Sequence, residues 1–210
     1  MGGRGSSFGR GGNSSGGNID VLSSTSLISQ REGQREEVDR VLTVLRDLNE
    51  RYGAELNDVQ VVTIRGSGAT AIAYYDAQGN LAFNKNYFDN PAIEQAYQRC
   101  VSSGFHPSQG SKSAIEAVAA HEMGHKLTDM AALKAGYGNW ALDRVANDII
   151  REAAKSLSVR HDALVSAVSG YAKQNNAEAV AEAFADVYCN GSKAAKESAA
   201  IIRELEKYFR

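Results

Sequence analysis

Two histidines four residues apart, His121 and His125, enclose Glu122 in the segment 121–125. On an α-helix this spacing brings the two imidazoles one turn apart on the same face. Imidazole nitrogens are zinc ligands, zinc lowers the pKa of a bound water toward ~7, and an adjacent carboxylate can accept the proton. The spacing therefore predicts a zinc (Zn2+) site for peptide hydrolysis, with Glu122 as the general base. The alternative is that both histidines are core residues whose ring nitrogens bond to neighbouring carbonyl groups.

The flanking sequence predicts that this motif lies in the middle of a helix. Ser111 or Ser113 is a plausible N-cap, and Glu116 follows Ser113 by three residues, as in a capping box. Apolar side chains recur at helical spacing on both sides of the motif. These are Ile115, Val118, Ala119, Leu127, Met130 and Leu133. We therefore expect the helix to be buried around most of its circumference.

A catalytic zinc ion usually has three protein ligands and keeps a fourth position for water, so a third ligand is needed. The metzincin pattern would require glycine at position 128 and histidine at position 131, where the chain has Thr128 and Ala131. That class is excluded. His106 and His161 are isolated in the sequence, and the turn sequence around His106 predicts surface exposure.

Three carboxylates offer a better source of the third ligand. Residues 177–188 read as a helix in which Glu178, Glu182 and Asp186 follow one another at four-residue steps. Like charges at this spacing repel, so a stripe of three in an apolar segment is explained by a nearby cation. A solvated acidic face, with the alanines packed behind it, is the alternative.

The second half of the pattern resembles a known family. Tyr171 precedes Glu178 by seven residues, and Glu182 follows four residues later with Ala183 and Phe184 behind it. Together with the segment 121–125, this resembles the zinc-binding half of the catalytic domain of anthrax lethal factor and its relatives, which are zincin metallopeptidases. The resemblance covers the chain from about residue 81 to the C-terminus.

The resemblance implies a zincin-like fold and a role for each matched residue. Glu178 would be the third zinc ligand, Glu182 would orient a ligating histidine, and the Tyr171 hydroxyl would stabilise the oxyanion. A thermolysin-like pattern, with Glu182 as ligand and Asp186 four residues later, also fits the sequence. We favour Glu178 because only that register satisfies the tyrosine spacing.

Short β-rich segments precede the metal-binding helix. Residues 59–65 and 69–75 are apolar and β-branched or aromatic, and 76–80 form a predicted turn into 81–84. We expect a hairpin in a small mixed sheet, with 81–84 as an edge strand beside the helix. An extended substrate could add to such an edge, or the strand could be an ordinary edge strand.

Further amphipathic segments predict several helices around this sheet, giving an α+β fold. Residues 28–52 carry an apolar stripe and should pack over the sheet. Residues 140–157, 162–173 and 194–208 add helices, so the long segment between His125 and Tyr171 connects the two halves of the predicted site.

The composition indicates which partners the chain could bind and whether its cysteines are reduced. The chain has 210 residues, 43% of them hydrophobic and 23% charged, which is enough for one compact domain over 28–210. A net charge of -2 gives no general attraction to nucleic acid or to anionic membranes, so we expect protein or peptide partners. Cys100 and Cys189 are far apart and are expected to be buried thiols.

Residues 1–27 are expected to form a flexible leader. The first seventeen residues are mainly Gly, Ser and Asn, and contain no apolar segment of a signal peptide. No run approaches the ~20 apolar residues that a membrane span needs, so we expect a soluble protein of the cytoplasm. The leader is similar to the starts of some bacteriophage and prophage proteins, which adds a virion-associated location and an alternative function: a non-enzymatic, zinc-stabilised phage structural or protein-binding component.

Overall fold

The computed structural model describes residues 34–65, 71–88, 90–138 and 141–210. The described chain is mostly helical, with one small sheet, so the predicted α+β class is confirmed. In chain order the elements are α2 (Arg35–Tyr52), β1 (Asp58–Val62), β2 (Ala73–Tyr75), β3 (Asn80–Asn84), α3 (Asn90–Ser102), α4 (Ala114–Lys134), α5 (Leu142–Leu157), α6 (His161–Val168), η3 (Tyr171–Lys173), α7 (Asn176–Asn190), η4 (Gly191–Lys193), α8 (Lys196–Glu206) and η5 (Lys207–Phe209).

The sheet is mixed, as predicted, but its strand order differs from expectation. β3 lies in the centre, parallel to β1 and antiparallel to β2. The prediction that residues 81–84 form an edge strand is therefore wrong. All four are buried, because β3 has a neighbouring strand on both sides and its side chains are covered on both faces. In the described sheet it is β2 that stands at the edge nearer α4.

The predicted turn between β2 and β3 is confirmed. The Asp76 carboxylate accepts hydrogen bonds from the backbone N–H groups of Gln78 and Asn80, each at 2.9 Å. Gly79 adopts a φ of +82°, a conformation that residues with a side chain rarely adopt. This turn fixes the antiparallel pairing in which Tyr74 lies opposite Ala82.

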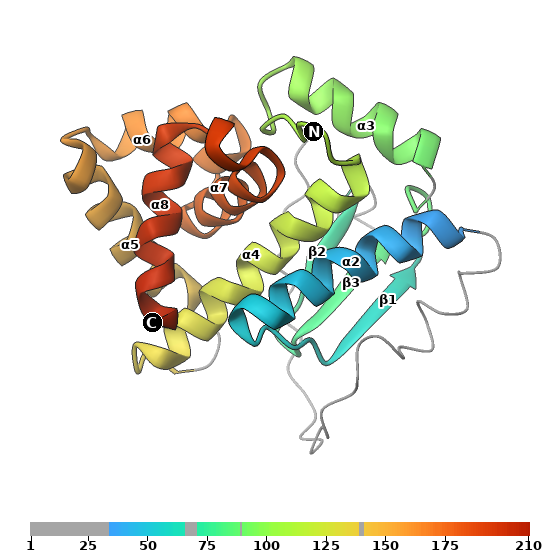
Figure 1. Ribbon diagram of the computed structural model, residues 1–210, viewed down its shortest axis with the longest axis horizontal. Coiled ribbons are helices and arrows are strands. Elements are labelled where there is room, and N and C mark those ends of the chain that lie inside the picture. The colour runs from blue at the N-terminus through green and yellow to red at the C-terminus, as the bar shows by residue number, and fades with distance from the viewer. Residues whose placement is uncertain (1–33, 66–70, 89, 139–140) are drawn as a thin grey trace.

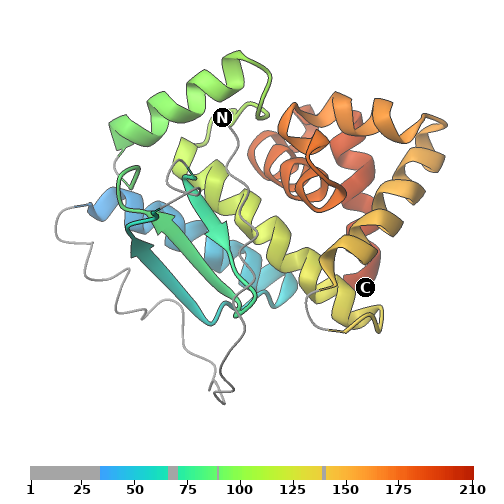
Figure 2. The same cartoon turned by 180° about the vertical axis from the view of Figure 1, so that it is seen from behind.

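Helix α4 crosses the middle of the molecule. Figures 1 and 2 show α2 and the sheet on one side of it and helices α5 to α8 on the other. α2 lies across one face of the sheet, as predicted for residues 28–52, although residues 28–33 lie outside the described residues. Ser113 is the N-cap of α4, which confirms one of the two predicted caps, and the Glu116 carboxylate accepts its backbone N–H at 2.9 Å.

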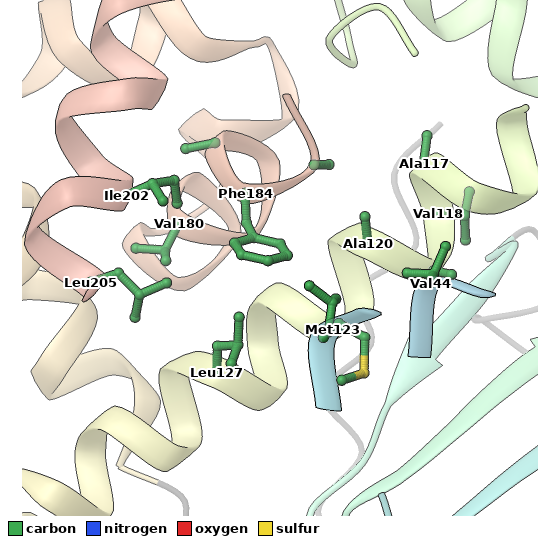
Figure 3. Close-up of a cluster of buried hydrophobic side chains, with 14 of the residues drawn as sticks. Val44, Ala117, Val118, Ala120, Met123, Leu127, Val180, Phe184, Ile202 and Leu205 are labelled. Atoms are coloured by element: carbon green, nitrogen blue, oxygen red, sulfur yellow. The ribbon is translucent and has the colours of Figure 1, made fainter. Parts of the chain in front are cut away.

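Apolar side chains from several helices meet along α4 (Figure 3). Phe184 of α7 points toward the α4 surface near Ala120, Met123 and Leu127. Gly124 permits an especially close approach, because a Cβ built on it would lie 2.8 Å from the Cα of Ala181. The tight packing of α4 against α7 sets the distance between the two halves of the predicted site.

The helix predicted over 162–173 is in fact two pieces. α6 ends at Val168, Ser169 adopts an extended backbone, and a short 3-10 turn, η3, begins at Tyr171. The break occurs because the backbone N–H groups of Gly170 and Tyr171 bond to the carbonyls of Gly104 and Phe105, at 2.8 and 2.9 Å, instead of continuing the helix. The other two predicted helices are confirmed as α5 and α8, with position 140 outside the described residues.

Both cysteines are free thiols, as predicted. Cys189 is buried, as predicted, but the predicted burial is wrong for Cys100, which is only partly covered because it lies near the exposed end of α3. Within the described part of the chain, no helix combines the length and the apolar character needed to cross a membrane. The predicted leader, 1–27, lies outside the described residues.

Candidate metal centre

The segment 121–125 lies in the middle of α4, as predicted. His121, Glu122 and His125 each offer a ligand atom, and these atoms lie within 4.8 Å of one another, so the group could hold a metal ion. The centroids of the two imidazoles are 5.0 Å apart. Helix geometry brings the two imidazoles together, because His121 and His125 are four positions apart on one α-helix.

Glu178 brings a carboxylate from α7 to both histidines. Its Oε2 atom lies 3.2 Å from Nε2 of His121 and 3.3 Å from Nε2 of His125. Asn175 caps α7 and accepts the Glu178 backbone N–H at 2.9 Å, which fixes this residue in the first turn. Burial alone would raise the pKa of Glu178, but the two histidines outweigh it and hold the pKa well below its usual range.

Oε2 of Glu178 and the Nε2 atoms of His121 and His125 are close enough together that they could share one cation. Adjacent ligands of a tetrahedral zinc ion with bonds of ~2.0 Å are separated by roughly 3.3 Å, close to the two observed distances. Oε2 of Glu178 and Nδ1 of His121 are buried, and among the described residues neither has a hydrogen-bond partner with favourable angles. A buried carboxylate oxygen without a well-directed donor is costly, and a cation would supply the missing interaction.

Glu182 lies behind the histidines, one turn further along α7. The residue is only 1% exposed. Oε1 lies 2.8 Å from Nδ1 of His121, on the ring edge opposite Glu178, and Oε2 accepts a hydrogen bond from Ser169 Oγ at 2.7 Å. Burial would raise the pKa of Glu182, but its hydrogen bond with His106 and the close contact with the His121 imidazole lower it to about 2. The carboxylate is therefore ionised at neutral pH.

Glu122 is buried beside the histidines and close to strand β2. Its carboxylate accepts a hydrogen bond from the backbone N–H of Tyr75. Burial raises the pKa of Glu122, and the neighbouring histidines oppose that shift only in part. A carboxylate with a raised pKa is a better proton acceptor near neutral pH than an ordinary glutamate.

Tyr171 lies over the same site because the 104–105 and 170–171 segments pair through their backbones. Its ring centroid is 5.8 Å from that of His121 and 5.2 Å from that of His106. Burial, followed by the charges of Glu178 and Glu122, raises the pKa of Tyr171. Its hydroxyl therefore stays protonated and able to donate a hydrogen bond throughout the physiological range.

Asp186 is not brought to the histidines. Its two carboxylate oxygens instead accept hydrogen bonds from Asn190 Nδ2 at 2.9 Å and from the backbone N–H of Ala195 at 3.0 Å. It thereby holds the end of α7 against the start of α8. Of the two predicted registers, the one based on Glu178 therefore has its carboxylate beside both histidines, whereas the Asp186 of the other register contacts neither.

His106 was predicted to be exposed, and this prediction is wrong. Its side chain is 18% exposed, and its Nδ1 lies 2.9 and 3.1 Å from the two carboxylate oxygens of Glu182. Burial would lower the pKa of His106, but hydrogen bonds with Cys100 and Glu182 raise it to about 9. Local spacing gave no signal for this contact, since it depends on the loop after α3 folding back onto η3 and α7. The remaining histidine, His161, is half-exposed and bonds to Asn176.

Comparisons with family models, with curated proteins and with solved structures find no match for this chain. The geometry of the candidate site is therefore the only basis for a proposed function.

Proposed function

We propose that this chain is a zinc-dependent endopeptidase of the zincin type. The observation that carries the proposal is the position of Glu178, whose Oε2 lies 3.2 and 3.3 Å from the Nε2 atoms of His121 and His125. Two imidazoles and one carboxylate, contributed by two tightly packed helices, form a common ligand set of catalytic zinc. A resemblance to the lethal factor family belongs to this proposal and is supported by the same residues.

The remaining residues of the site supply the proton chemistry of peptide hydrolysis. When bound, zinc would lower the pKa of a coordinated water and polarise the scissile carbonyl. Glu122 accepts the proton of the attacking water and later delivers it to the leaving amine, a role that suits its raised pKa. Tyr171 keeps its proton and donates a hydrogen bond to the oxygen that becomes negatively charged in the transition state.

The substrate class follows from this chemistry. The site contains a metal-ligand set, a general base and a hydroxyl donor, which together hydrolyse an amide bond. We propose that a protein or peptide is the substrate.

The decisive experiment compares the parent protein with Glu122→Gln for zinc content and for cleavage of a mixed peptide library. Because Glu122 is placed as the base and not as a ligand, the variant should bind one zinc ion and lose nearly all cleavage, by ~10²–10⁴-fold. Glu152→Gln, an exposed carboxylate on α5, is the matched control and should cleave like the parent.

The possible outcomes separate the two functions under consideration. Cleavage by the parent that is lost in Glu122→Gln, with zinc retained in both, supports the peptidase. Zinc in the parent without any cleavage would instead favour a zinc-stabilised structural or binding component. Cleavage that survives in Glu122→Gln would remove the proposed mechanism.

A further inference from the structure

His106 is outside the proposed ligand set, but it contacts Glu182 and Tyr171, the two residues that support that set. His106 lies between two tyrosines: its ring stacks parallel to that of Tyr97, with centroids 5.5 Å apart, and meets that of Tyr171 at 5.2 Å and 64°. Tyr97 is itself anchored, since its hydroxyl donates to the Pro107 carbonyl at 3.2 Å. The imidazole is therefore held in a defined plane.

This plane directs Nδ1 of His106 at the Glu182 carboxylate. The distances are 2.9 Å to Oε1 and 3.1 Å to Oε2. The same Oε1 atom lies 2.8 Å from Nδ1 of His121, and Ser169 donates to Oε2 at 2.7 Å. One buried carboxylate therefore connects two imidazoles, one that carries a proposed ligand nitrogen and one that does not.

We infer that His106 is a positioning residue, which fixes the Glu182 carboxylate behind His121 and the Tyr171 ring beside the reacting groups. The effect of His106 on Tyr171 rests on the proposed peptidase function, whereas its effect on His121 requires only that the site binds a metal ion. A hydrogen bond from His106 fixes the rotamer of Glu182, and Glu182 in turn sets the orientation of the His121 ring.

Two replacements separate these contacts. His106→Phe keeps a planar ring between Tyr97 and Tyr171 but removes the donor to Glu182. His106→Asn removes the ring but keeps an amide N–H at nearly the position of Nδ1. If His106 merely fills space, the phenylalanine variant should behave like the parent and the asparagine variant should be the worse of the two.

The measurement is metal affinity, by competition with a chromogenic chelator, together with the visible absorption spectrum of the cobalt-substituted protein. We expect His106→Phe to bind zinc ~10–100-fold more weakly, with an altered cobalt spectrum, and His106→Asn to retain the affinity and the spectrum of the parent. For cleavage, we expect His106→Asn to lower kcat with little change in KM, because the Tyr171 ring loses its neighbour. His161→Phe, at a half-exposed histidine, is the matched control and should change neither property.

A double-mutant cycle isolates the proposed path. In a Glu182→Gln background, His106→Phe should have no further effect on zinc affinity, since its contribution passes through that carboxylate. Parent-like affinity and spectrum in His106→Phe would overturn the inference, as would equal losses in the phenylalanine and asparagine variants. If His106→Phe does not fold, a loss of affinity in His106→Asn overturns the inference and retention supports it. A parent that binds zinc without cleaving would remove the peptidase proposal, while the affinity comparison would still decide the role of His106.

Discussion

The two helices that form the site differ in where their chemistry comes from. α4 contributes His121, Glu122 and His125 from a single five-residue segment, so helix geometry alone brings them together. α7 contributes carboxylates whose roles depend on which other parts of the chain they meet. A local motif is therefore sufficient to predict the α4 half of the candidate site, whereas the α7 half depends on tertiary contacts.

The carboxylate stripe of α7 makes this dependence clear. Glu178, Glu182 and Asp186 follow at equal steps, yet the first meets two histidines and the second meets His106, His121 and Ser169. The third holds the backbone of Ala195. Equal spacing along a helix places side chains on one face, but the neighbours that cover each turn of that face decide which contacts each side chain makes.

The largest expected difference lies between the two ends of this stripe. Glu178→Ala removes a proposed ligand, so zinc affinity should fall by more than the ~10–100-fold that loss of an outer-shell partner costs. Asp186→Ala should keep the parent's zinc affinity but lower the free energy of unfolding by about 1–3 kcal/mol, because the Ala195 N–H loses its acceptor.

Zinc titration and chemical denaturation of the two variants would measure both effects. If Asp186→Ala loses zinc and Glu178→Ala keeps it, the α7 register proposed here is wrong and the one pairing Glu182 with Asp186 is restored. If both variants lose only stability, α7 has no role in metal binding and the contrast between the helices disappears.

A smaller effect is expected where α4 and α7 touch. In Gly124→Ala the new methyl group would lie 2.8 Å from the Cα of Ala181, so the backbones must move apart. Overpacking of this kind costs about 1–3 kcal/mol, and the better helix propensity of alanine returns up to about 1 kcal/mol. We expect a net loss of stability, together with weaker zinc binding, since Glu178 moves away from the histidines.

Leu133→Ala provides the control on the same helix, because Leu133 is 47% exposed and lies beyond the contact. Its stability and its zinc affinity should both stay close to those of the parent. Equal zinc affinity in Gly124→Ala and the parent would show that the two halves of the site tolerate separation, contrary to the tight coupling argued here.

The same contrast explains which features the sequence could predict. The mid-helix position of the segment 121–125, its Ser113 cap, the turn at 76–80 and the hairpin depend on residues close in sequence, and the structure confirms these four features. The central position of β3 depends on its parallel pairing with β1, a contact across a long connection that alternation within one strand does not reveal.

The contacts around Glu182 are a second feature that could not be predicted from the sequence. Helical periodicity over 162–173 gives no sign of the break at Ser169, because the competing hydrogen bonds come from Gly104 and Phe105. His106 and Ser169 reach the carboxylate only through that break. Residues that are isolated in the sequence can therefore contact the candidate site, and a search based on ligand spacing misses them.

The smallest effect is expected at the N-terminus of α4, where the Ser113 cap should affect stability but not zinc binding. Burial would raise the pKa of Glu116, but hydrogen bonds from Ser113 and the charge of Lys112 lower it below its ordinary value of 4.5. Ser113→Ala removes the hydroxyl that donates to this carboxylate at 2.7 Å. The free energy of unfolding should fall by about 1 kcal/mol at neutral pH, the usual cost of losing such a cap.

The pH dependence of this loss follows from the direction of the shift. Because the folded-state pKa of Glu116 lies below its unfolded value, the bonded carboxylate stabilises the protein above pH 4.5 and loses that effect as the pH falls through the folded-state pKa. The difference in unfolding free energy between the parent and Ser113→Ala should therefore be largest at pH 7 and decrease in acid. The zinc affinity of Ser113→Ala at pH 7 should equal that of the parent. A difference that stays constant to pH 3 would show that the hydroxyl acts apart from the carboxylate, and a loss of zinc affinity would show that the cap also orients the histidines two turns away.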